Sequence, residues 1–141
     1  MRKFLLLLMA TSVAGASEVD FSQFNRSLDY AQVTHVAASQ RSDRSWCFDA
    51  TVRHHDQGWD HYADGWQVVD MAGNQLGYRL LAHPHDNEQP FTRRQCNIQI
   101  PDGVTKVAVR ARCNVHGYGG KAVVVDLTRQ EGEGYRVRRV D

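Results

Sequence analysis

The chain has 141 residues, with 17 Lys and Arg against 16 Asp and Glu, so its net charge is +1 at pH 7. This balance argues against binding to nucleic acid, which requires a basic surface, and we expect no nucleic acid partner. The length fits one domain with its own hydrophobic core.

Residues 1–16 are expected to be a signal peptide. Arg2 and Lys3 precede a short apolar run over residues 4–9, and Ala14 to Ala16 form an A-x-A cleavage pattern. The run is far shorter than the roughly 20 residues of a membrane-spanning helix. No cysteine for lipid attachment follows the cleavage pattern. We therefore expect a periplasmic or secreted protein with no membrane span, whose mature chain has 15 basic and 16 acidic residues.

The remaining chain alternates between apolar and polar residues with a period of two, which is typical of half-buried β-strands. Residues 17–28 lack this period and are expected to form an N-terminal arm. Turn signals such as Ala72-Gly73-Asn74 separate the alternating runs. The expected strands are residues 29–38, 46–54, 66–71, 75–82, 92–100, 105–113 and 121–128.

Seven short strands without a long helical pattern predict an all-β domain over residues 29–128. The expected fold is an antiparallel seven-stranded β-sandwich of the immunoglobulin or fibronectin type III kind, with a small jelly-roll barrel as the alternative. Residues 129–141 have three arginines among their last six residues and are expected to form a polar C-terminal tail. A docking arm for an acidic partner is the alternative interpretation of this tail.

Strand parity predicts where the unusual loops lie. Successive antiparallel strands run in opposite directions, so the connections after the second, fourth and sixth strands share one end of the domain. These connections are residues 54–65, 83–91 and 114–120. Six of the seven histidines lie on or beside them, namely His54, His55, His61, His83, His85 and His116.

A histidine-rich end could bind a transition metal, with copper and zinc as the expected ions. Pro84 favours extended geometry at His83, so His83 and His85 could project to the same side. The full set of expected metal ligands is His61, His83, His85, His116, His55, Asp60 and Glu88. The alternative is that these side chains only fix the shapes of the loops by hydrogen bonds, with Glu88 paired to Arg93 or Arg94.

Aromatic residues accompany the same loops. Trp59, Tyr62 and Tyr118 could bind an envelope protein or a glycan, because aromatic rings bury a large area with few rotatable bonds. Trp66 and Phe91 are expected to close the end of the core instead. No nucleophile motif or Cys/His pair is evident, so we expect no catalytic residues and no enzyme activity.

Export places the three cysteines in an oxidising compartment, where one disulfide is expected. Cys96 and Cys113 both lie near the histidine end at core-facing positions, which predicts a bridge between them. Closing this segment would stabilise the fold by about 3 kcal/mol. Cys47 alternates with Trp46 and Phe48, so it is expected to point outwards as the unpaired thiol. Alternatively, all three cysteines remain reduced.

The segments GWDHYADGW, HPHDNEQPFTR and VHGYGGK together resemble the signature of an uncharacterised family of small secreted bacterial proteins, written HPHxxEQPFTR and VHGYGGK. The resemblance covers residues 46–128. It implies export and a compact domain, but it supplies no known activity and assigns no functional residue. The cysteines are not part of this pattern, so the expected bridge is a feature of this chain.

Overall fold

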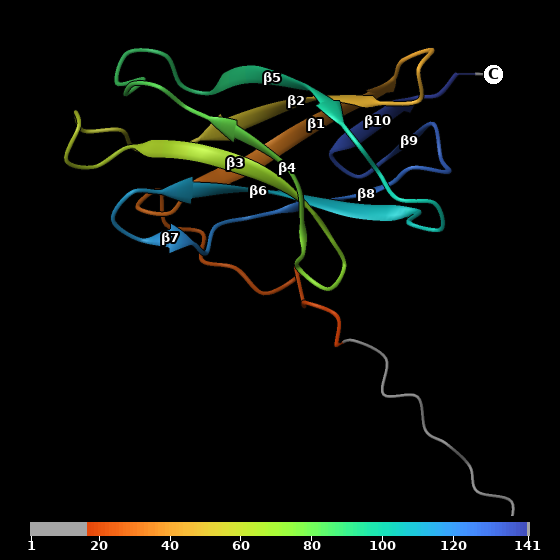
Figure 1. Ribbon diagram of the computed structural model, residues 1–141. Coiled ribbons are helices and arrows are strands. Elements are labelled where there is room, and N and C mark those ends of the chain that lie inside the picture. Colours follow the sequence, from red (N-terminus) through yellow and green to blue (C-terminus); the bar gives the residue numbers. More distant parts are fainter. Residues whose placement is uncertain (1–16, 141) are drawn as a thin grey trace, which may run out of the picture.

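The structure, a computed structural model, describes residues 17–140 as an all-β chain with two sheets (Figure 1). The expected signal peptide, residues 1–16, lies outside the described residues. Within residues 17–140 no helix forms, so this part of the chain offers no helical membrane span.

The described residues contain ten strands. In chain order they are β1 (Gln32–Gln40), β2 (Trp46–Arg53), β3 (Ala63–Asp70), β4 (Gln75–Leu80), β5 (Phe91–Ile98), β6 (Lys106–Cys113), β7 (Gly117–Tyr118), β8 (Val123–Asp126), β9 (Glu131–Gly132) and β10 (Tyr135–Arg138). Each of the seven expected strands has a counterpart, in β1 to β6 and β8. The expected number of strands was wrong because β7, β9 and β10 are added.

The first sheet has the order β5-β2-β1-β10-β9, and the second has the order β4-β3-β6-β7 with β8 also paired to β6. The two sheets form the upper and lower layers in Figure 1. Every pairing is antiparallel except that of β1 with β10, which is parallel. The expectation of a purely antiparallel fold therefore fails at this one pair.

Both sheets contribute to one hydrophobic core. Val36 and Phe48 of the first sheet, and Trp66 and Val109 of the second, are fully buried in it. Burial of each such side chain contributes about 1.5–3 kcal/mol. Phe91 is also buried at 2% exposure, which confirms that Trp66 and Phe91 belong to the core.

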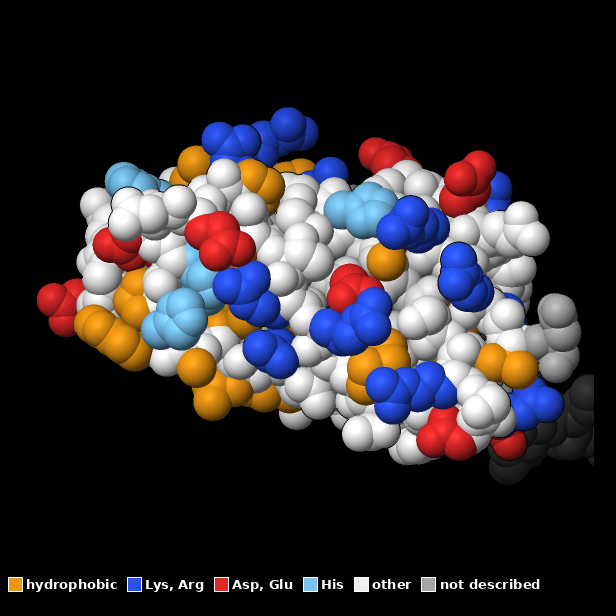
Figure 2. Space-filling view, turned by 90° about the horizontal axis from the view of Figure 1, so that it is seen from above, with side chains coloured by type: hydrophobic (Ala, Val, Ile, Leu, Met, Phe, Trp, Pro, Cys, Tyr) orange, Lys and Arg blue, Asp and Glu red, His pale blue; other side chains and the backbone are white. Residues whose placement is uncertain are grey.

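The C-terminal segment is not a polar tail. Tyr135 and Val137 of β10 are buried in the core, while the intervening Arg136 and the following Arg138 are exposed. This segment therefore alternates between buried and exposed residues, as a half-buried strand does. The alternation spans only four residues, two of which are arginine, so the sequence pattern resembles a polar tail. These arginines lie on the outer face of the first sheet, which Figure 2 shows with its Lys and Arg side chains in blue.

The N-terminal arm is fastened to the domain. The Val19 N–H donates to the Met71 carbonyl at 2.8 Å, and the Asn25 N–H donates to the Gly119 carbonyl at 2.8 Å. The next residue, Gly120, lies so close to the start of β1 that a Cβ there would be 2.0 Å from the Ala31 carbonyl oxygen. Glycine is therefore required where this loop packs against the end of the arm.

Candidate functional site

The three loops expected at one end of the domain do meet there, at the left of Figure 1. The Gly58 N–H donates to both carboxylate oxygens of Asp86, each at 3.1 Å. The Tyr62 N–H donates to Asn114 Oδ1 at 2.9 Å, and Asn114 Nδ2 donates to the Trp59 carbonyl at 3.0 Å. The loop after β2 is thus tied both to the loop after β4 and to the loop after β6, as strand parity predicts.

A buried carboxylate, Asp56, organises this end. Asp56 Oδ1 accepts a hydrogen bond from His54 Nδ1 at 2.5 Å and another from the Ala63 N–H at 3.0 Å. Asp56 Oδ2 accepts from the His85 N–H at 2.7 Å. Burial alone would raise the pKa of Asp56, but the hydrogen bonds from His54, His85 and Ala63 outweigh it and lower the pKa. The carboxylate is therefore ionised at neutral pH.

Imidazole rings extend from Asp56 towards the third loop. The ring centroid of His54 lies 4.6 Å from that of His61, and the ring of His61 lies 5.3 Å from that of His116. The ring of Tyr30 closes the series, 5.3 Å from His116. The rings pass from a buried position at His54 to an exposed one at His116.

Two groups of possible metal ligands overlap in this series. One consists of His54, His61 and Cys113, and the other of Asp29, His61 and His116. Within each group the ligand atoms lie within 4.8 Å of one another. His61 belongs to both groups, and both of its ring nitrogens are buried without a hydrogen-bond partner. This position is where a metal ion would satisfy an unpaired donor atom.

His83 and His85 do not join these groups, although the sequence predicts that they share a site with His61 and His116. Their rings form a separate pair with centroids 4.5 Å apart. His85 stacks on the core ring of Phe91, with centroids 3.9 Å apart and planes at 8°. Asp56 lies between the two clusters, bound to the ring of His54 and to the backbone of His85.

The pKa of His85 is lowered because its ring is buried, and the nearby charges of Arg93 and His83 lower it further. Both ring nitrogens of His85 lack a hydrogen-bond partner. The imidazole is therefore neutral and acts mainly as a core ring against Phe91.

The other expected ligands lie on the surface. His55 and Asp60 are exposed, and neither belongs to a ligand group of three residues within the described part of the chain. Glu88 accepts a hydrogen bond from Arg93 Nη1 at 3.3 Å, and this interaction lowers its pKa. This confirms the alternative interpretation for Glu88, in which it is a partner of Arg93.

Three potential ligands were missed by the sequence interpretation. The sequence predicts the correct end for His54 but does not identify it as a ligand, and it predicts that Asp29 belongs to the first strand. It predicts a disulfide for Cys113. A signal was available for His54, because its spacing from Asp56 allows a carboxylate to orient the imidazole.

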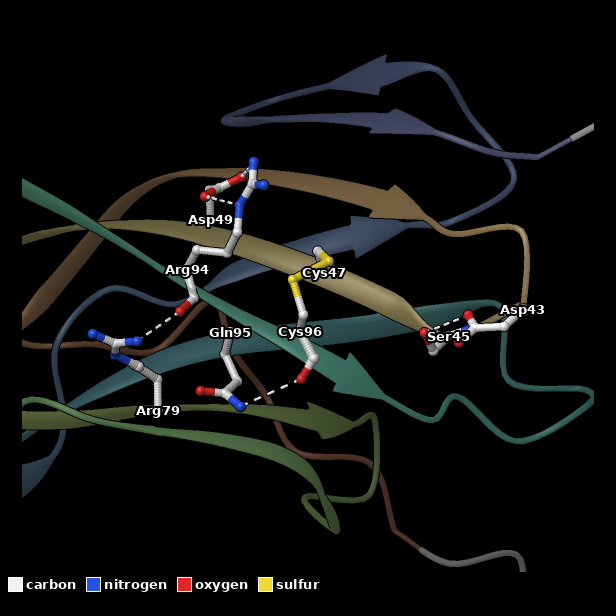
Figure 3. The surroundings of a disulfide bond; sticks show 8 residues. All are labelled: Asp43, Ser45, Cys47, Asp49, Arg79, Arg94, Gln95 and Cys96. Carbon is white, nitrogen blue, oxygen red and sulfur yellow. Dashed lines mark hydrogen bonds and ion pairs between the residues drawn. A yellow bond between two sulfur atoms is a disulfide. The ribbon is translucent and has the colours of Figure 1, made fainter.

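The predicted Cys96–Cys113 disulfide is wrong, because Cys96 is bonded to Cys47 instead (Figure 3). Cys113 is a free, fully buried thiol. The expectation that Cys47 is the unpaired thiol is therefore also wrong. Cys47 does lie on the other face of the sheet from Trp46 and Phe48, but it is buried at 2% exposure in its bond to Cys96.

A β-bulge in β5 explains the different pairing. Phe48 pairs with Gln95 and Trp46 pairs with Ile98, so Cys96 and Asn97 together lie opposite the single residue Cys47. Asn97 has a φ of 58°, a left-handed conformation that such a bulge can require. The extra residue puts Cys96 and Ile98 on opposite faces of the sheet, so Cys96 lies beside Cys47 and not in the core.

Of the three expected binding aromatics, Trp59 and Tyr62 are in contact, whereas Tyr118 packs against Arg110. Trp59 is 65% exposed, and the ring of Tyr62 lies edge-on to it at 5.6 Å. Trp59 lines an open groove of about 690 Å³ together with His83, Asp86 and Glu88. The remaining aromatic, Tyr118, is partly buried under the guanidinium group of Arg110 at 4.7 Å, and burial raises its pKa.

These features define an all-β domain whose loop end is lined by histidines, a free cysteine and a buried carboxylate. No protein-family model matches the chain, and no solved structure matches it. A protein of Halomicrobium mukohataei with the name "Putative lipoprotein" is 43% identical over 115 residues, which is 82% of this chain and 55% of that protein. The chain thus spans about half the length of this relative, and the HPHxxEQPFTR and VHGYGGK signature stays a prediction.

Proposed function

We propose that the domain is an exported metal-binding module that holds one zinc or copper ion at His54, His61 and Cys113, with His116 and Asp29 on the solvent side. The observation that carries this proposal is the position of His61. Its two buried nitrogens have no hydrogen-bond partner, yet each ligand group includes it. Leaving such a buried polar group unpaired costs about 1–3 kcal/mol, which metal binding would offset.

His54 has the environment of a metal-binding histidine. Asp56 accepts the Nδ1–H hydrogen bond, so Nε2 could bind a metal that displaces its proton. In the structure His54 Nε2 lies 3.1 Å from the Asp29 carbonyl oxygen. An ion bound there would replace this contact, while the Asp56 carboxylate would keep the ring in the same orientation.

Cys113 supports a thiophilic ion. A buried thiolate needs a positive charge beside it, and zinc and copper bind thiolate and imidazole together. Tetrahedral zinc ligands lie about 3.3–3.8 Å apart when bonds are about 2.0–2.3 Å long. The ligand atoms here lie within 4.8 Å of one another, so small side-chain movements would form the site.

Export is part of this proposal. The N-terminal pattern of charge, apolar run and small residues favours it. The name of the Halomicrobium mukohataei relative points to the cell envelope, and the Cys47–Cys96 disulfide suits an oxidising compartment. We further propose a role in metal storage or delivery, without catalysis.

Calorimetric titration of tag-free, chelator-treated protein with Zn(II), and with Cu(I) under anaerobic conditions, tests the proposal. One ion per chain should bind. His61→Ala should weaken binding by more than the roughly 10–100-fold that loss of an outer partner of a ligand costs. His83→Ala is the matched control and should bind like the wild type. Absence of stoichiometric binding of either ion contradicts the proposal.

The exposure of Trp59 favours a second candidate function, binding of an envelope glycan or protein. An exposed indole beside a groove with carboxylates can stack on a sugar ring while the carboxylates bind its hydroxyl groups. Binding to envelope extract should be lost in Trp59→Ala and kept in Tyr118→Phe. Equal binding by wild type and Trp59→Ala contradicts this function.

We also infer an immunoglobulin-related topology. The first, second and fifth strands share one sheet, whereas the third, fourth, sixth and eighth share the other. This division resembles the arrangement of immunoglobulin-type sandwiches, in which the third and sixth strands pair away from the first and second. The β9 and β10 strands are then an addition after the last strand of that pattern.

A further inference from the structure

The outer face of the first sheet has a basic groove that the metal site does not use. The groove has a volume of about 800 Å³ and is lined by five arginines and two acidic residues. Those arginines are Arg94, Arg129, Arg136, Arg138 and Arg139. One acidic residue, Asp49, is already neutralised, because both of its oxygens accept hydrogen bonds from Arg94 at 2.9 Å.

The groove follows from the residues on neighbouring strands. Ala37 of β1 is in register with Asp49 of β2 on one side and with Arg136 of β10 on the other. Two residues further along β1, Ser39 is in register with Arg138. Small side chains on the central strand therefore form a floor between walls of long side chains. The walls are two strand spacings apart, or about 10 Å.

The charge on the β10 wall is not neutralised. Among the described residues, no carboxylate lies within ion-pair distance of Arg136 or Arg138, and both arginines are exposed. Glu131, the second acidic residue of the lining, is opposite Arg136 in the β9 pairing but forms no ion pair with it. Two guanidinium groups thus offer planar, bidentate donors to a carboxylate ligand.

We propose that this groove binds an extended acidic peptide segment of a partner protein. Alternate side chains of an extended peptide are about 6.4–6.8 Å apart, which is also the spacing of Arg136 and Arg138 along β10. Carboxylates at every second position would therefore face both arginines. Among residues 17–140 no aromatic residue lines the groove, so this lining offers no stacking surface for a sugar or a base.

The peptide would bind through its side chains. The floor strand β1 is already paired with β2 and β10 on its two sides, so it has no free edge to which a peptide strand could be added. Binding is therefore expected to depend on ionic strength and on the acidic side chains, with little dependence on the peptide backbone.

Fluorescence anisotropy with a labelled peptide of alternating Glu and Ser, at physiological ionic strength, tests the proposal. The wild type should bind it and should not bind the matched peptide of Gln and Ser. The double variant R136Q/R138Q should weaken binding by about tenfold or more, because it removes two charge-assisted contacts. Its thermal unfolding should stay close to that of the wild type, since both side chains are exposed.

The control is R26Q/R53Q, which removes the same charge from exposed arginines outside the groove lining. It should change the affinity by less than about twofold, since distant charges are screened at this ionic strength. Three results would overturn the proposal. These are no binding of the Glu peptide, equal weakening in both double variants, or tighter arginine-dependent binding of an acidic oligosaccharide.

Discussion

The Asp56 carboxylate and the His54 imidazole form a buried hydrogen bond of 2.5 Å, with both side chains fully shielded from solvent. This pair lies at the centre of the loop end. Asp56 also accepts a hydrogen bond from the backbone N–H of His85. The hydrogen bond to Asp56 holds the His54 ring with its centroid 4.6 Å from that of His61. The same contact therefore fixes the loops and orients the proposed metal ligand.

Replacement of Asp56 should destabilise the protein strongly. Asp56→Ala leaves the Ala63 and His85 N–H groups without acceptors and removes the partner of His54. Loss of one member of such a buried pair costs about 3–5 kcal/mol. Urea unfolding at neutral pH measures the change. A loss below about 1 kcal/mol would show that the carboxylate does not organise this end.

The pH dependence of the free energy of unfolding should show the lowered pKa of His85. Burial lowers its pKa below the ordinary value of 6.5, so the unfolded chain binds a proton that the folded ring resists. Stability from this group is complete above pH 6.5 and decreases as the pH falls through 6.5 towards the lower folded pKa. His85→Phe keeps the stack on Phe91 without a titratable group.

The His85→Phe variant should match or exceed the wild-type stability at pH 7, because it removes two unpaired buried nitrogens. Its advantage over the wild type should grow between pH 7 and pH 5. Denaturant unfolding at several pH values gives this difference. An advantage that stays constant with pH would contradict the lowered pKa.

The disulfide assignment predicts the result of peptide mapping. Alkylation under denaturing, non-reducing conditions should label Cys113 alone, and digestion should release a peptide pair that joins Cys47 to Cys96. The bridge closes a segment with a sequence separation of 49, so C47A/C96A should lose about 4 kcal/mol of stability. Alkylation at Cys47 in the oxidised protein would refute the pairing.

Strand parity predicted the location of the site because it depends only on the count of strands. The loops after β2, β4 and β6 lie at one end because two strands separate each of these loops from the next. The additional strands do not disturb this count. The two-residue β7 lies within the third loop, whereas β9 and β10 follow β8.

Parity could not predict contacts that depend on a single irregular residue. One left-handed residue, Asn97, puts Cys96 and Ile98 on opposite faces of the sheet and so changes the disulfide partner. The division of the histidines also depends on side-chain packing. The ring of His85 stacks on Phe91, and the ring of His54 is hydrogen-bonded to Asp56. The alternation of apolar and polar residues predicts neither contact.

Only one of the two histidine clusters, the one that contains His54, His61 and His116, is expected to bind metal. His83→Ala/His85→Phe should leave the affinity for Zn(II) within about twofold of the wild-type value, because neither residue belongs to a ligand group in the described chain. Calorimetry with the intact disulfide gives the affinities. A large loss of affinity would show that the metal binds instead at the loop that contains His83, Pro84 and His85.

Cobalt substitution tests the proposed metal site most directly, because Co(II) bound to a thiolate gives a charge-transfer absorption band that reports the sulfur ligand itself. Tag-free protein titrated with Co(II) should develop this band in proportion to one ion per chain, and Zn(II) should abolish it. The band should be absent in Cys113→Ala and present in His83→Ala. A protein that develops no band, or one whose band survives loss of Cys113, would contradict a site built from His54, His61 and Cys113.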